Sequence, residues 1–172
     1  MLNQQASFGG VFMVECRDAE GNLKWTEEFP NLVVNEGLQY INTQFFKGVT
    51  YTATWFMGLV TGPGASNTYA AGNTMVTHAG WAENTAYVQT ARPTMAFGTA
   101  TTADPSVIVT SAPVVFTMNA SAIIAGAFVT TDNVKGGTAG TLFSVGNFTV
   151  GDRPIVSGDT LNVTYTFSAD AA

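Results

Sequence analysis

The sequence contains few side chains that could carry nucleophilic or metal chemistry, with a single histidine, His78, and a single cysteine, Cys16. A zinc site needs further His, Cys or carboxylate ligands at local spacing, and the run Met75–Trp81 around His78 supplies none. A Ser-His-Asp hydrolase would also depend on His78, but the chain has no G-x-S-x-G run to present a serine. The glycine-rich runs of nucleotide-binding proteins are absent as well. We therefore expect no catalytic residue, no bound metal and no cofactor.

The other chemical candidates have simpler structural interpretations. Cys16 ends the apolar run Val11–Cys16, which predicts a small buried hydrophobic side chain. The run Asp18–Asn22 lacks the full ligand series and the closing glutamate of a calcium loop, so it predicts the turn of a β-hairpin. Glu27 and Glu28 are adjacent, and adjacent strand residues point to opposite faces. They are therefore a poor match for the two carboxyls of a glycosidase.

The amino-acid composition indicates a single domain with few charged residues and a strong preference for strands. The 172-residue chain has the length of one domain, and 46% hydrophobic residues are enough for a full core. Only 10% of its residues are charged, against about 25% in an average soluble protein. The net charge is -6, and without clustered Lys and Arg we expect no binding to nucleic acid. The 25 threonines favour strands and predict a polar but uncharged surface.

The N-terminal residues Met1–Ser7 lack a basic segment followed by an apolar core, so they do not indicate a secretory signal. No apolar run approaches the roughly 20 residues that span a bilayer. We expect synthesis and folding in a cytoplasm, and no membrane partner.

The pattern of apolar and turn residues predicts an all-β fold, a two-sheet β-sandwich or jelly roll. Residues 1–8 are expected to form a flexible N-terminal arm, and residues 9–172 a single β-rich domain. One short helix is expected at about 36–46, where Asn35 would cap its start and Leu38, Ile41 and Phe45 would share one face. Strands are expected at residues 9–16, 23–29, 32–34, 50–60, 87–90, 94–97, 107–109, 114–118, 123–130, 141–145 and 161–167.

Several stretches of the chain resemble small structural proteins of tailed bacteriophages. The resemblance is carried by residues 11–25, by residues 29–37 with their N-x-V-x-x-x-G spacing, and by the runs YTATWFMGL (51–59), GNTMVTHAGWAEN (72–84) and TTDNVKGGTAG (130–140). The family that these stretches resemble is that of head decoration, or cement, proteins. Such proteins have β-rich folds, sit on the outer capsid, brace neighbouring capsomers and contribute no catalytic residue.

This resemblance implies a non-enzymatic virion protein on the capsid surface, made in the cytoplasm of a bacterial host. Its partner would be the major capsid protein, and its copies would form a homo-oligomer on the capsid lattice. The hairpin at 11–29 and the arm at 1–8 are the candidate capsid contacts. Within the hairpin we expect contact through Phe12, Glu15, Trp25, Glu27 and Phe29.

Two other classes of function stay open from the sequence. A tail or fibre protein would bind a host surface through exposed loops, and residues 61–74 are the first loop to consider. An enzyme or a carbohydrate-binding module would need a concave pocket that holds Trp81 or Trp55 with an Asp or Glu nearby.

Overall fold

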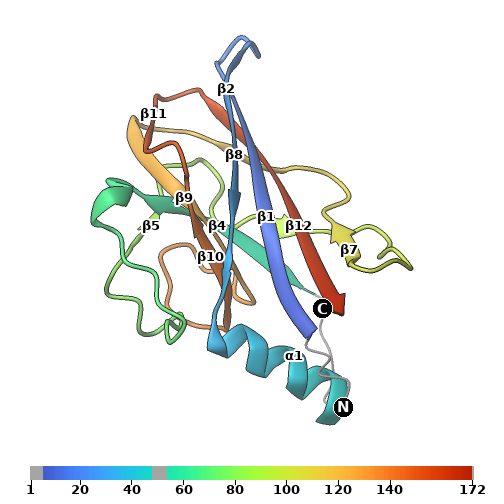
Figure 1. Ribbon diagram of the computed structural model, residues 1–172. Helices are drawn as coiled ribbons and strands as arrows, with labels where there is room; N and C mark the ends of the chain where they lie inside the picture. The colour runs from blue at the N-terminus through green and yellow to red at the C-terminus, as the bar shows by residue number, and fades with distance from the viewer. Residues whose placement is uncertain (1–5, 48–53, 172) are drawn as a thin grey trace.

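The computed structural model describes residues 6–47 and 54–171, which form two antiparallel sheets packed face to face (Figure 1). The five-stranded sheet consists of β1 (Ala6–Arg17), β2 (Leu23–Pro30), β7 (Ser106–Val109), β8 (Val114–Thr117) and β12 (Thr160–Ala171). The seven-stranded sheet consists of β3 (Leu32–Val33), β4 (Trp55–Thr61), β5 (Glu83–Asn84), β6 (Thr94–Met95), β9 (Ala122–Thr130), β10 (Leu142–Asn147) and β11 (Arg153–Ile155). This arrangement confirms the predicted two-sheet β-sandwich.

The strand order is β2-β1-β12-β7 in the five-stranded sheet, with β8 also paired to β12. In the seven-stranded sheet it is β3-β10-β9-β4-β5, with β11 paired to β9 and β6 paired to β4. The chain thus ends beside its beginning, because β12 lies between β1 and the β7–β8 region (Figure 1). Of the strand expected at 50–60, β4 forms from Trp55 onward, and residues 50–53 lie outside the described residues.

The β1–β2 hairpin forms where the sequence predicted it. Asp18 Oδ1 accepts the backbone N–H of Asn22, and Gly21 has a φ of 87°, a conformation that favours glycine. β1 begins earlier than expected, at Ala6, because its first residues pair with the end of β12. Phe8 stacks on Phe167 in this part of the pair. Residues 6–8 of the predicted arm therefore belong to the sheet, and residues 1–5 lie outside the described residues.

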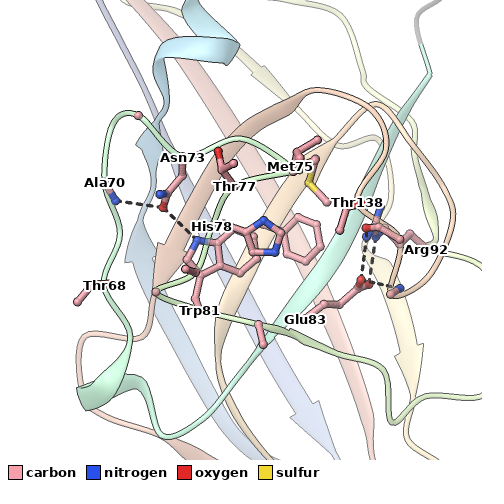
Figure 2. A pocket seen from close by; sticks show the side chains of 18 residues that line it. Thr68, Ala70, Asn73, Met75, Thr77, His78, Trp81, Glu83, Arg92 and Thr138 are labelled. Carbon is pink, nitrogen blue, oxygen red and sulfur yellow. Dashed lines mark hydrogen bonds and ion pairs between the residues drawn. The ribbon is translucent and has the colours of Figure 1, made fainter.

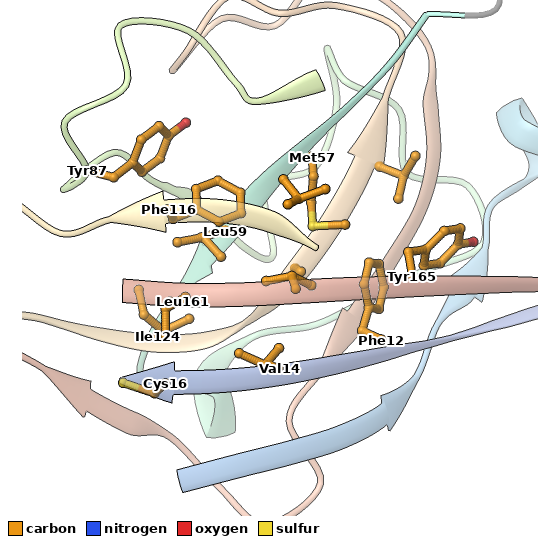
Figure 3. Close-up of a cluster of buried hydrophobic side chains, with 14 of the residues drawn as sticks. Phe12, Val14, Cys16, Met57, Leu59, Tyr87, Phe116, Ile124, Leu161 and Tyr165 are labelled. Carbon is orange, nitrogen blue, oxygen red and sulfur yellow. The ribbon is translucent and has the colours of Figure 1, made fainter. Parts of the chain in front are cut away.

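The inward faces of the two sheets share one core (Figure 3). β1 contributes Phe12 and Val14, and β4 contributes Met57 and Leu59, all at most 1% exposed. β12 forms where a strand was expected at 161–167, and its buried residues alternate at Leu161, Val163 and Tyr165. Because fully burying such a side chain contributes about 1.5–3 kcal/mol, this core supplies much of the driving force for the sandwich.

The predicted helix is present as α1 (Asn35–Lys47), and it lies at one end of the sandwich (Figure 1). Glu36, in the first turn of the helix, accepts the backbone N–H of Leu142 at 2.8 Å and so joins the helix to β10. Of the face expected to be shared, only Ile41 packs against the core. Leu38 and Phe45 are exposed, because the helix crosses the end of the sandwich instead of lying flat on a sheet.

The outer face of the seven-stranded sheet is covered by residues 62–82, here called the covering segment, which includes the 3-10 turn η1 (Gly64–Ser66). Backbone hydrogen bonds join Gly62 to Ile123, Ala82 to Thr61 and Ala71 to Asn35, and they hold this segment in place. Beneath it lies a second core of Val34, Val60, Met75, Trp81, Ala125, Phe128, Leu142 and Val145. β4 and β9 are consequently buried on both faces.

Candidate functional site

The structure separates the five residues that were expected to contact a capsid. Phe12 and Phe29 are 0% and 1% exposed, and their rings stack at 5.1 Å inside the core. Glu27 is also buried, and Trp25 is half-buried with its ring edge-on to Phe148. Glu15 alone faces outward from the sheet. Alternate strand residues face the core, and Phe12, Glu27 and Phe29 lie on that side, so these three side chains are not exposed for a contact.

Glu27 joins the hairpin to the loop before β11. Its Oε2 accepts a hydrogen bond from the Arg153 guanidinium at 2.6 Å, and its Oε1 accepts the backbone N–H groups of Thr149 and Val150, each at 3.1 Å. Burial raises the pKa of Glu27, but the Arg153 hydrogen bond and those of Val150 and Thr149 outweigh it, so the pKa lies below its ordinary value. Glu27 is therefore an ionised structural clamp.

The outward residues of β1, β2, β8, β7 and β12 form the open face of the five-stranded sheet. Met13 is 43% exposed at its centre and Val115 is 42% exposed, so no described segment lies across it. Figure 1 shows β1 and β12 side by side with no helix over them. The strand register produces three rows: Val115, Asn162, Glu15 and Thr26; then Thr164, Met13 and Glu28; then Val109, Thr166, Val11 and Pro30.

Charge is sparse in the three central rows of the open face. Glu15 is paired with Arg17 at 3.0 Å, and Glu28 is the other charged residue in the three rows. The remaining residues supply hydroxyl, amide and methyl groups. Such a face can make broad contacts with another protein with little electrostatic desolvation cost.

A groove of about 990 Å³ opens on the opposite side of the sandwich, between the covering segment and residues 136–138 (Figure 2). Its apolar lining comes from Met75, Trp81 and Phe128 of the second core. Its polar lining includes Thr68, Asn73, Thr77, His78 and Thr138. The groove therefore combines an aromatic surface with neutral hydrogen-bonding groups.

Three rings pack against one another in the groove wall. Trp81 packs on Phe128 with ring centroids 5.2 Å apart, and His78 stacks on Trp81 at 4.2 Å (Figure 2). The Trp81 indole N–H donates to Asn73 Oδ1 at 3.2 Å, which fixes the amide orientation of Asn73. His78 Nδ1 lies 3.0 Å from the carbonyl oxygen of Thr74, and because a carbonyl only accepts, Nδ1 carries the proton. In the neutral imidazole, Nε2 is then an acceptor.

A buried ion pair forms another part of the groove lining. Arg92 binds Glu83 through two hydrogen bonds of 3.1 and 2.8 Å, and its side chain is fully buried. Arg92 also donates to the carbonyl oxygens of Asp132 and Gly137, so it holds the loop that lines the groove. Glu83 completes the network by accepting the hydroxyl of Tyr87, whose pKa is raised by burial and which stays protonated.

Arg92 was not predicted as a site residue from the sequence. The feature that could have identified it is the scarcity of basic residues, since the chain has only 6 Lys and Arg residues. An arginine that is buried among neutral residues needs a carboxylate partner. The expected pocket that holds Trp81 with a carboxylate nearby is present, since both Trp81 and Glu83 line the groove. Glu83 is, however, fully engaged by Arg92, Tyr87 and the backbone N–H of Gly136.

Cys16 is buried as predicted. Burial, followed by the nearby Asp159 carboxylate, raises the pKa of its thiol to about 11, so the thiol is protonated at neutral pH. Asp18 accepts the side-chain amide and the backbone N–H of Asn22, which lower the pKa of Asp18 and occupy its carboxylate in the hairpin turn.

Within residues 6–47 and 54–171, no cluster of three or more His, Cys, Asp or Glu side chains is arranged to hold a metal ion. No described helix has the length and apolar character to cross a membrane. Comparisons with family models, curated proteins and solved structures give no match to the chain.

Proposed function

We propose that the chain is a non-enzymatic virion structural protein that decorates and stabilises the outer surface of a phage capsid. The observation that supports this proposal is the open face of the five-stranded sheet, whose three central rows are at least partly exposed and carry threonine and apolar side chains with only two charged residues, Glu15 and Glu28. Its partner would be the major capsid protein. Glu15 stays among the contact residues, and its outward neighbours Met13, Thr164 and Val115 replace the buried side chains of the hairpin.

The end of α1 provides a surface for contacts between copies. Phe45 and Phe46 are 80% and 85% exposed, far more than any core residue. Burial of one such ring contributes about 1.5–3 kcal/mol, so a second copy that covers them gains substantial free energy. We propose that these rings take part in the homo-oligomeric contacts of copies on the capsid lattice.

Binding of the protein to an assembled capsid is thermodynamically favourable for two reasons. A protein that binds only the assembled capsid stabilises it by mass action. Many weak contacts over one lattice also bind together far more tightly than each would alone. The net charge of -6 would disfavour binding to the packaged genome.

Sedimentation with capsids of the cognate phage, before and after shell expansion, tests the proposal. The purified protein is expected to co-sediment with at least one capsid form. Met13→Arg, which places a long charged side chain at the centre of the open face, is expected to weaken binding by at least about tenfold, because the longer side chain prevents a partner from packing closely on this face. Ala139→Arg adds the same charge on the groove side of the sandwich and should leave binding unchanged.

Failure to co-sediment with every capsid form would contradict the decoration function. Equal binding by Met13→Arg and the unsubstituted protein would contradict the assignment of the open face. The alternative, a tail or fibre protein that binds a host surface, is distinguished by the position of the protein in an electron-microscopy map of the intact particle.

A further inference from the structure

We propose that the groove beside Trp81 is a binding site for a neutral oligosaccharide. The aromatic part of the site is His78, which stacks on Trp81 with one face. His78 lines the groove and is partly exposed, so part of its ring is accessible to a ligand. The apolar C–H face of a sugar ring packs well on such a ring, because aromatic faces attract partial positive charge.

The polar groups of the groove match sugar hydroxyls, which both donate and accept hydrogen bonds. His78 Nε2 is an acceptor, because Nδ1 donates to Thr74. Asn73 uses its Oδ1 for Trp81 and for the backbone N–H of Ala70, which leaves its Nδ2 hydrogens as donors toward a ligand. Thr138 adds an exposed hydroxyl that can do both.

The charged side chains that line the groove are already paired with each other, which favours a neutral ligand. Glu83 and Arg92 are the only charged side chains among the described residues that line the groove, and they pair with each other. Every oxygen of Glu83 already accepts at least one hydrogen bond from Arg92, Tyr87 or Gly136, so an anionic or cationic sugar finds no counter-charge. The same engagement removes Glu83 as a proton donor to a glycosidic bond, which makes this a site that binds sugars without cleaving them.

The size and position of the groove fit this use. At about 990 Å³ it is at the upper end of the roughly 300–1,000 Å³ of small-molecule sites, which leaves room for more than one sugar ring. It opens over the seven-stranded sheet, whereas the open face belongs to the five-stranded sheet. Sugar binding is therefore separable from capsid attachment, and a capsid-bound copy would present the groove outward.

Nuclear magnetic resonance titration of the full chain tests the proposal. The probes are maltotriose, triacetylchitotriose and galactotriose as neutral sugars, with trigalacturonate and adenosine monophosphate as charged comparators. The Trp81 indole N–H signal, assigned with Trp81→Phe, is expected to shift with at least one neutral sugar, and the signals of Trp25 and Trp55 are expected to stay in place. Concentrations up to roughly 10 mM detect even a millimolar dissociation constant.

Two neighbouring substitutions on one exposed loop provide the matched control. Thr138→Arg fills the groove, and Ala139→Arg adds the same side chain next to it without lining the groove. Thr138→Arg is expected to weaken sugar binding by at least about tenfold, a loss of roughly 1.4 kcal/mol. Ala139→Arg is expected to bind as the unsubstituted protein does, and both variants should still sediment with capsids.

Three results would overturn the proposal: no shift of the Trp81 signal with any neutral sugar, equal binding by Thr138→Arg and Ala139→Arg, or a shift with the charged comparators alone. None of these results bears on capsid attachment, which has its own sedimentation test.

Discussion

The two outer faces of the sandwich differ in what lies over them. On the five-stranded sheet, residues 12–17 of β1 and 160–165 of β12 alternate between buried and at least partly exposed side chains, and the outward ones meet solvent. On the seven-stranded sheet, β9 is buried at every residue from Ile124 to Thr130, because the covering segment builds a second core on its outer side. One sheet is therefore a surface and the other is the middle layer of three.

This difference shows where a small β-sandwich can form a concave site. An open sheet face is suited to broad contacts, whereas a segment folded over a sheet leaves a groove at its margin. The Arg92–Glu83 pair, whose side chains are 0% and 7% exposed, is found at that margin, while the Arg17–Glu15 pair on the open face is partly exposed. Pairs of substitutions of the same type, made at two contrasting positions, measure the difference in stability between these environments.

The largest difference is expected for the two arginines. Arg92→Met leaves the buried Glu83 carboxylate without its partner and should lower the free energy of unfolding by about 3–5 kcal/mol. Arg17→Met breaks an ion pair of similar length whose side chains are 39% and 36% exposed, and should cost about 0–1 kcal/mol. Urea unfolding of both variants measures the difference, and equal losses would show that the two pairs share one environment.

The two methionines should follow the same order. Met75 is 1% exposed beneath the covering segment, and Met75→Ala should cost about 2–5 kcal/mol because it leaves a cavity in the second core. Met13 lies on the open face, and Met13→Ala should change stability by no more than about 0.5 kcal/mol. Thermal unfolding monitored by circular dichroism is sufficient to rank them. A large loss for Met13→Ala would mean that the open face is covered in the isolated protein.

Two strand glycines extend the comparison to the backbone. A Cβ at Gly58 would overlap the ring of Phe128, which is itself held by Trp81 and Arg92, so Gly58→Ala should cost about 1–3 kcal/mol. A Cβ at Gly9 meets no atom within 4 Å. Gly9→Ala should leave stability unchanged or raise it by up to about 1 kcal/mol, because alanine restricts the unfolded chain. Denaturant midpoints of the two variants should move in different directions or by clearly different amounts.

The elements that were predicted correctly are those determined by residues close together in the sequence. The β1–β2 hairpin follows from the Asp18–Asn22 turn, β12 from its strict alternation, and α1 from Asn35 and the apolar spacing after it. The short strands β5 and β11 were missed because they contain two and three residues and form only where a longer strand pairs with them. Residues 87–90, expected as a strand, contribute only the bridge between Tyr87 and Met118.

The candidate sites were predicted less well, for a physical reason. Alternation in β1 shows that Phe12 and Met13 face opposite ways, and burial in the core is the usual environment of a phenylalanine. The pocket around Trp81 was anticipated with a carboxylate nearby. The role of Arg92 was not, because its contacts with Asp132 and Gly137 join residues about 40 positions apart.

The smallest and most pH-dependent contrast concerns Glu27 and Glu28, neighbours on β2 that face opposite sides of the sheet. Glu27→Gln weakens the link to Arg153 and should cost about 1–2 kcal/mol at neutral pH, while Glu28→Gln should stay within about 0.5 kcal/mol. The pKa of Glu27 is lowered in the folded protein, so its contribution is complete above its unfolded value of about 4.3 and disappears as the pH falls through the folded value. The difference between Glu27→Gln and the unsubstituted protein should therefore shrink below about pH 4 in urea unfolding experiments. A difference that stayed constant down to pH 2 would mean that packing of the hairpin, and not the charge on Glu27, holds the loop before β11 in place.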